Sequence, residues 1–117
     1  MSNEDQLKGK PTNLAEGVQY AEGSIVSKTL LQKKTGSLTL FAFDAGQGLS
    51  EHTSPYDATV YILDGEASLI IGGETGKAAA GEMVVMPANV PHDVQAKQRM
   101  KMLLIMIRDS DSKEDRS

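Results

Sequence analysis

The chain of 117 residues contains no cysteine and no tryptophan, and it has only two histidines. The absence of cysteine excludes disulfides, thiolate metal sites and cysteine nucleophiles, and nothing marks an oxidising compartment. His52 and His92 are therefore the residues whose placement matters most for metal binding or for proton transfer near neutral pH.

The sequence also lacks a long apolar run and a strong charge of either sign. Its longest apolar stretch, MLLIMI at 102–107, is far too short to span a bilayer, and the start has no apolar segment typical of a signal peptide. The net charge is −4, and no lysine and arginine cluster is interleaved with aromatic residues. We expect no nucleic acid and no membrane among its partners, and a cytoplasmic location.

Short strands with turns between them fill most of the chain. SLTLFAF at 37–43 and EASLII at 66–71 alternate between two faces, and Asp64-Gly65 is a dipeptide suited to a tight hairpin turn. No long helical pattern interrupts them. The pattern predicts an all-β fold, a small antiparallel β-barrel or sandwich.

Polar segments flank this strand-rich region. Residues 1–16 show no periodicity, and the last ten residues, RDSDSKEDRS, have no apolar anchor. We expect a flexible N-terminal arm over 1–16, one barrel domain over 17–108 and a disordered C-terminal tail over 109–117.

Two segments within this domain have the spacing of a known pair of motifs. They keep the glycines, proline and histidines that define those motifs, namely Gly46, His52, Gly65, Gly81, Pro87 and His92. Over about residues 46–96 the chain resembles the cupin superfamily, which implies a small double-stranded β-helix of the jelly-roll type. Asn89 replaces one motif glycine, a mild change because asparagine tolerates positive φ, and Ala96 replaces the motif asparagine.

The resemblance also implies a metal site, since a complete cupin site holds a divalent metal by three histidines and one glutamate. His52 matches the first of these ligands and His92 the last. Ser54 replaces the second histidine, and Ala58 replaces the glutamate. Both histidines of the chain fall on ligand positions, so we expect them to converge at the mouth of the barrel.

A native metal site would need about three protein ligands. Glu51, Asp57 and Asp93 each lie one residue from a ligand position, and neighbours in a regular strand point to opposite faces. A β-bulge could rotate Asp57 inward. Asp57 is therefore the candidate third ligand, with Fe, Mn, Ni or Zn as the candidate metals.

Without a metal, the same residues predict a small, mostly apolar cavity with two imidazoles and a hydroxyl near its mouth. Strand alternation and the motif turn the lining residues inward, and Met86 adds a flexible apolar wall. The predicted pocket residues are His52, Ser54, Ala58, Val60, Ile62, Met86 and His92. Such a pocket suits a small organic ligand that carries one or two polar groups.

Two other patterns have plain structural explanations. Met100, Met102 and Met106 share strand parity with Leu104, which predicts a place in the core rather than a soft-metal site. Tyr61 alternates out of phase with its neighbours and is expected to pack on the opposite face of its strand.

Three functions remain open. The leading hypothesis is a cupin that binds a small organic molecule near His52 and His92, with metal absent or weakly held. The second is a metal-dependent cupin enzyme of the oxygenase or decarboxylase type. The third is a structural or interaction barrel with a vestigial pocket. Whether the chain is an enzyme stays open, and the resemblance together with exposed sheet edges predicts a homodimer.

Overall fold

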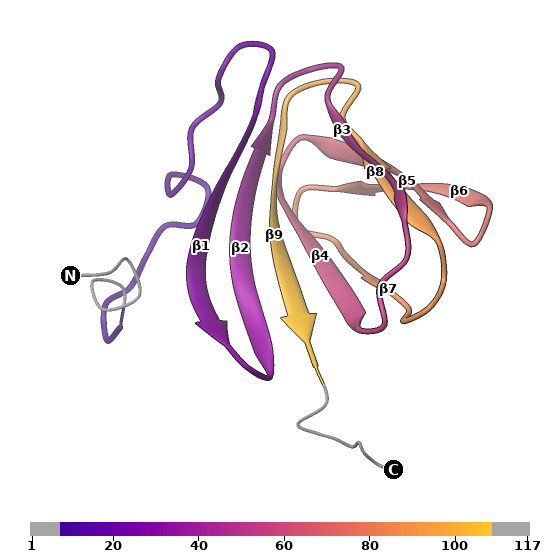
Figure 1. Ribbon diagram of the computed structural model, residues 1–117. Helices are drawn as coiled ribbons and strands as arrows, with labels where there is room; N and C mark the ends of the chain where they lie inside the picture. The colour runs from indigo at the N-terminus through magenta and orange to yellow at the C-terminus, as the bar shows by residue number, and fades with distance from the viewer. Residues whose placement is uncertain (1–7, 109–117) are drawn as a thin grey trace.

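The computed structural model describes residues 8–108, and these residues form nine strands and no helix (Figure 1). The predicted all-β fold is confirmed. The strands are β1 (Ile25–Lys33), β2 (Gly36–Phe43), β3 (Gly48–His52), β4 (Asp57–Asp64), β5 (Glu66–Ile71), β6 (Glu74–Ala79), β7 (Met83–Met86), β8 (His92–Gln95) and β9 (Met100–Ile107). No helix within the described part of the chain is long and apolar enough to cross a membrane.

The strands form two antiparallel sheets that face each other. One sheet has five strands in the order β1-β2-β9-β4-β7, and the other has four in the order β3-β8-β5-β6. Figure 1 shows the two sheets facing each other, and the core residues fill the region between them. Strands that are neighbours in the sequence often lie in different sheets, because the chain crosses between them.

Strand alternation assigns the side chains to faces as predicted. Phe41 and Phe43 of β2 belong to the core between the two sheets, and Leu40 and Ala42 belong to a second cluster on the outer face of the five-stranded sheet. Tyr61 joins this outer cluster, which confirms that it packs away from the barrel interior.

The segment before β1 covers part of the outer face of the five-stranded sheet. Leu14, Val18 and Tyr20 pack against the outer cluster, and Lys101 Nζ donates a hydrogen bond to the carbonyl oxygen of Ala15 at 2.5 Å. The predicted arm therefore includes at least one residue, Leu14, with a defined packing site. Residues 1–7, and the predicted tail at 109–117, lie outside the described residues.

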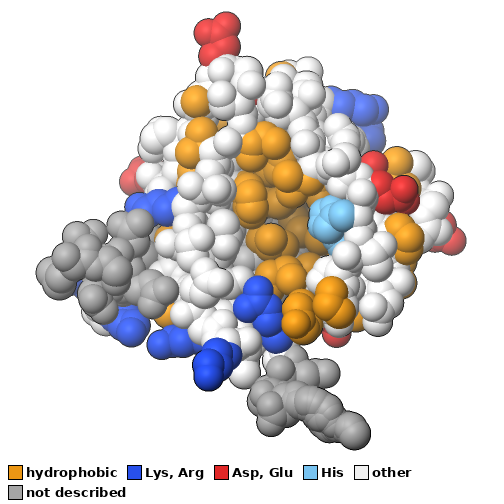
Figure 2. All heavy atoms as spheres, in the orientation of Figure 1, with side chains coloured by type: hydrophobic (Ala, Val, Ile, Leu, Met, Phe, Trp, Pro, Cys, Tyr) orange, Lys and Arg blue, Asp and Glu red, His pale blue; other side chains and the backbone are white. Residues whose placement is uncertain are grey.

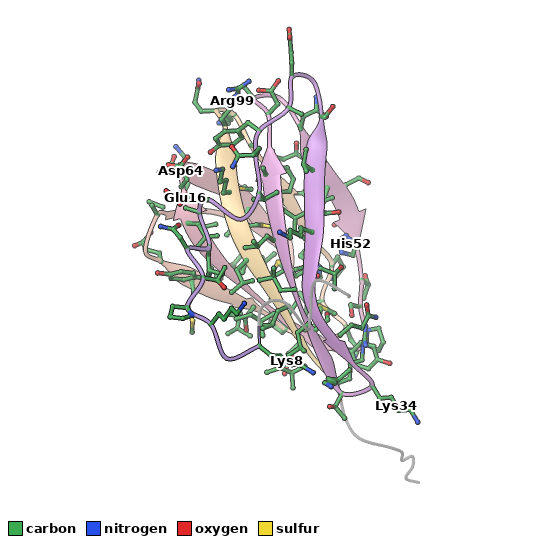
Figure 3. The ribbon with its side chains drawn as sticks, turned by 90° about the vertical axis from the view of Figure 1, so that its left-hand side faces the viewer. Lys8, Glu16, Lys34, His52, Asp64 and Arg99 are labelled. Atoms are coloured by element: carbon green, nitrogen blue, oxygen red, sulfur yellow. The ribbon has the colours of Figure 1, made fainter. Side chains whose placement is uncertain are left out.

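Charged groups hold this covering segment at one end of the sheet. The Tyr20 hydroxyl donates to Asp64 Oδ2 at 2.5 Å, and burial together with that bond raises the pKa of Tyr20 well above its usual value. Arg99 Nε donates to Asp44 at 2.8 Å, and this bond and the Gly23 amide lower the pKa of Asp44 to about 2. In Figure 3 the labelled Asp64 and Arg99 lie beside the covering segment, and His52 lies on the other side of the sheet.

The prediction of a hairpin at Asp64-Gly65 is wrong. Gly65 does adopt a left-handed backbone, with φ of 77°. However, β4 pairs with β7 and β9, and β5 pairs with β6 and β8. The turn therefore carries the chain from one sheet to the other. A left-handed glycine permits a sharp corner of either kind, so the dipeptide alone cannot distinguish them.

Candidate functional site

The two histidines lie opposite each other on neighbouring strands. His52 ends β3, His92 begins β8, and the two residues are register partners. Their Nε2 atoms are 3.2 Å apart, and the rings meet edge to face with centroids 4.4 Å apart. His92 is 2% exposed, whereas His52 is exposed at the rim. The structure thus brings together the two residues that the motifs single out.

A β-bulge in β3 directs His52 into the barrel. Leu49 pairs with Val94 and His52 pairs with His92, so two residues of β3, Ser50 and Glu51, lie opposite the single residue Asp93 of β8. In a regular strand, Leu49 and His52 would point to opposite faces, because their positions differ by three. The bulge between them turns both side chains to the inside. The bulge lies in β3 beside His52, whereas β4 shows no shift of register at Asp57.

Backbone carbonyls fix the orientation of both rings. Nδ1 of His52 lies 2.9 Å from the carbonyl oxygen of Ser50, and Nδ1 of His92 lies 3.1 Å from that of Val90. A carbonyl oxygen only accepts, so each Nδ1 carries a hydrogen and each neutral ring presents a lone pair at Nε2. Two lone pairs that face each other at 3.2 Å repel. The arrangement becomes favourable when a proton or another electrophile lies between the two nitrogens.

The histidines lie at the mouth of a cavity of about 50 Å³ between the two sheets. Figure 2 looks into this hollow, with apolar side chains lining it and a histidine at its rim. Five predicted pocket residues line it, namely His52, Ser54, Ala58, Met86 and His92. Val60 and Ile62 do not line it. Both are fully buried in the core, because residues further along β4 lie deeper between the sheets.

Five further residues line the cavity that sequence reasoning did not assign to it: Leu49, Val94, Met102, Leu104 and Met106. Met100 and Met102 are core residues as predicted, while Leu104 and Met106 pack against the core from partly buried positions. Their shared parity along the strand is evident in the sequence. The pairing of β9 with β4, which brings Met106 beside Ala58, has no local sequence signal.

The loop that carries the second motif is tied to the first by backbone hydrogen bonds. Asn89 has φ of 65°, which confirms that asparagine takes the conformation of the motif glycine. Its amide donates to the carbonyl oxygen of Ser54 at 2.7 Å. Ala96, in the place of the motif asparagine, exchanges bonds with Gly46 and Gln47. The Asn89 bond ties the end of the β3–β8 pair that carries the two histidines, and the Ala96 bonds tie its other end.

The candidate third ligand lies elsewhere. Asp57 Oδ1 accepts a hydrogen bond from the amide of Ala88 at 2.8 Å, and Asp57 does not line the cavity. Asp93 lines a groove on the outer face of the four-stranded sheet, as alternation from His92 requires. Within residues 8–108, no group of three or more His, Cys, Asp or Glu side chains is placed to hold a metal ion.

The two imidazoles nevertheless have the geometry of neighbouring metal ligands. The two Nε2 atoms are 3.2 Å apart. An ion bound to both of them by bonds of about 2.0–2.1 Å would have an N–ion–N angle of about 100°. Carbonyl bonds to both Nδ1 atoms are also the usual support for metal-bound histidines. Two ligands fall short of the three that catalytic metal sites generally use. The residues present therefore fit part of a metal shell and not a complete one.

This two-sheet barrel, with its histidines on the third and eighth strands, has clear counterparts among known proteins. The model of the cupin domain matches residues 39–107, more than half of the chain. The chain belongs to the cupin family.

Individual relatives agree on the fold. A conserved protein of unknown function from Streptococcus pyogenes is 36% identical, with a TM-score of 0.83 over 88% of this chain and 90% of that one. A cupin superfamily protein from Desulfitobacterium hafniense is 28% identical, with a TM-score of 0.82 over 87% and 94% of the two chains. An uncharacterised protein of Streptomyces coelicolor is 34% identical over 62 residues, which span 53% of this chain and 59% of that protein.

Proposed function

We propose that the chain binds a small organic molecule at the cavity mouth, with metal absent or weakly held. The observation that carries the proposal is the pair of imidazoles, whose Nε2 atoms face each other at 3.2 Å above an apolar cavity. One shared proton converts the facing lone pairs into an N–H···N hydrogen bond and gives the pair a positive charge. A carboxylate or a similar acidic group of the ligand is then the natural partner.

The size of the cavity limits the ligand. About 50 Å³ is room for roughly three or four water molecules and is well below the several hundred Å³ of most ligand pockets. Only a short apolar segment of a ligand enters, among Leu49, Ala58, Met86, Leu104 and Met106. The rest stays at the rim, where His52 is exposed. Flexible methionine side chains can widen the space at modest cost.

A metal-dependent activity is the second candidate. It is favoured by the angle of about 100° that the two Nε2 atoms would subtend at a shared ion, given their separation of 3.2 Å. His52 and His92 would hold the ion, and solvent or substrate would complete its shell. Such an ion would polarise a bound oxygen group. Proton transfer without metal, as in an isomerase or cyclase, would use the same two imidazoles, since such a pair can donate a proton to a ligand or accept one from it.

We expect untagged protein to contain much less than one equivalent of Fe, Mn, Ni or Zn by elemental analysis.

A series of short carboxylates from acetate to hexanoate should show a maximum in affinity at the length whose carbon chain fills the cavity. His52→Ala with His92→Ala should weaken that binding at least tenfold, because the cationic partner is lost. Titration calorimetry and NMR shifts of the cavity methyl groups measure it.

Glu51→Ala is the matched control, since Glu51 adjoins His52, is exposed and does not line the cavity. It should leave carboxylate binding unchanged. If the wild type contains one equivalent of metal and the His52→Ala, His92→Ala variant contains none, the metal-dependent function would be favoured over binding of an organic ligand without metal. If the protein binds neither a metal nor a carboxylate, the result would favour a structural barrel with a vestigial pocket.

The homodimer also stays a prediction, and exposed apolar residues support it. Met83, Val85 and Ile107 are 63%, 48% and 64% exposed. They lie on the outer face of the five-stranded sheet, beyond the part that residues 14–20 cover. We expect sedimentation of the wild type to give twice the mass of one chain. The variant with Met83→Lys and Val85→Lys should give the mass of one chain, because dimerisation would bury two unpaired charges from each copy.

Ile70→Lys provides the control for this experiment. Ile70 is 36% exposed but lies on the other sheet, in β5. Its replacement should leave the sedimentation mass unchanged. A wild-type mass of one chain would contradict the dimer.

A further inference from the structure

An aromatic and a basic side chain continue the wall of the histidine cavity toward its mouth. Ala58 of β4 and Met106 of β9 are register partners, and both line the cavity. Tyr56 and Arg108 each lie two residues beyond one of these partners, so strand alternation places them on the same face of the sheet, about 7 Å further along. Both are half-buried. Figure 2 shows basic side chains at the lower rim of the same hollow.

The position of Arg108 is fixed by its backbone and by Tyr56. The Arg108 amide donates to the carbonyl oxygen of Thr35 at 2.7 Å, which holds the end of β9 against the β1–β2 turn. The guanidinium carbon lies 5.3 Å from the centre of the Tyr56 ring, a distance typical of a cation–π contact. Tyr56 is itself tied to the cavity wall, because its amide donates to Ser54 Oγ at 3.1 Å.

These contacts leave most of the donors of Arg108 available. A guanidinium has five N–H groups, and its Nη1 lies 3.5 Å from the carbonyl oxygen of Lys33, which is long for a hydrogen bond. The two ion pairs found within residues 8–108 join other side chains. An arginine held on an aromatic ring is well suited to bind a carboxylate through two parallel N–H bonds.

The mouth of the cavity therefore has two groups that attract anions, one from each sheet. His52 and His92 lie on β3 and β8 of the four-stranded sheet, and Arg108 follows β9 of the five-stranded sheet. Facing sheets pack about 10 Å apart, and the side chains reach into this space from both sides. A short carbon chain is enough to join a group at the imidazoles to a group at Arg108.

We infer that the ligand of the histidine site is a short dicarboxylate, with one carboxylate at the paired imidazoles and the other at Arg108. The inference rests on the proposed function and deepens it, because it gives the ligand a second acidic group. Arg108 selects for this second group. Tyr56 is a positioning residue, since it holds the guanidinium at the mouth.

The test compares succinate with butyrate, which has the same number of carbon atoms but only one carboxylate. We expect the full chain to bind succinate about tenfold more tightly or better, because Arg108 adds charge-assisted hydrogen bonds. Arg108→Gln should make succinate bind no better than butyrate. Arg108→Lys should keep part of the preference, because it keeps the charge and loses the planar fork. Titration calorimetry measures all these affinities.

Lys34→Gln is the matched control for charge. Lys34 is exposed in the β1–β2 turn, and Figure 3 shows it pointing away from the barrel. Its replacement removes the same charge from the same end of the molecule and should leave the preference for succinate unchanged. An equal loss in Lys34→Gln and Arg108→Gln would indicate long-range attraction rather than a site at Arg108, and would overturn the inference.

A spectroscopic measurement separates binding at Arg108 from an effect on folding. The side-chain Nε–H signal of Arg108, assigned by its loss in Arg108→Gln, should shift on saturation with succinate and much less with butyrate. Tyr56→Phe should retain the preference for succinate, whereas Tyr56→Leu should reduce it. Equal binding of succinate and butyrate by the wild type would overturn this inference and leave the proposed function standing. If neither carboxylate binds, both fail.

Discussion

Ser54→His combined with Ala58→Glu should convert the weak or absent metal site into a tight one. Both side chains line the same cavity as His52 and His92, and they stand at the two positions where the family motif has its remaining ligands. The double variant should bind one equivalent of Zn²⁺, Mn²⁺, Ni²⁺ or Fe²⁺. We expect its affinity to exceed that of the wild type by on the order of a hundredfold or more, as four protein ligands replace two.

The same variant should become less stable when it holds no metal. Ala58 is 3% exposed, so a glutamate there places a carboxylate among apolar side chains at a cost of about 1–3 kcal/mol. The hydrogen bond from the Tyr56 amide to Ser54 Oγ, of 3.1 Å, is lost as well. Metal at a concentration of about 1,000 times its Kd should raise the free energy of unfolding of the variant by about 4 kcal/mol. Urea unfolding with and without metal, alongside calorimetric titration, measures both effects.

Ser54→His with Ala58→Gln is the matched control, because it keeps the size of the added side chain and removes its charge. It should bind metal far more weakly than the glutamate variant. Equal affinities would show that the carboxylate does not reach the ion. Failure of both variants to bind metal more tightly than the wild type would mean that positions 54 and 58 do not converge with the histidines.

Much of this site followed from the sequence because the cupin motifs encode spacing along strands. The two histidines, Ser54, Ala58 and Met86 line one cavity, as the motif spacing and alternation predicted. Strand parity also separated the core residues of β2 from those of its outer face. Both results depend on a period of two residues, which short regular strands keep.

The remaining features depend on contacts between distant segments. The bulge before His52 arises from the register of β3 with β8. The place of Leu104 and Met106 in the cavity wall arises from the packing of β9 on β4. The groove around Asp93 needs three strands to assemble. Nothing local in the sequence marks any of these, because register and strand order are properties of the assembled sheets.

The corner at Gly65 is the second place where a single substitution should have a large effect. A Cβ atom there would collide with the backbone oxygen of Arg99 and would lie 3.0 Å from the Cβ of Met100. Its φ of 77° also strains any residue other than glycine. We expect Gly65→Ala to lower the free energy of unfolding by about 3–4 kcal/mol, the sum of the left-handed cost and a forced backbone shift. Urea unfolding followed by circular dichroism measures the loss.

Gly73→Ala separates the two causes. Gly73 has φ of 83°, and nothing lies within 4 Å of the position of its Cβ, so this variant should lose only about 1 kcal/mol. The difference between the two variants isolates the collision with Arg99. Equal losses would mean that the corner has room to relax. A large difference would show that the β4–β5 corner cannot move away from the segment before β9, so the close contact between Gly65 and Arg99 is fixed by the packing around it.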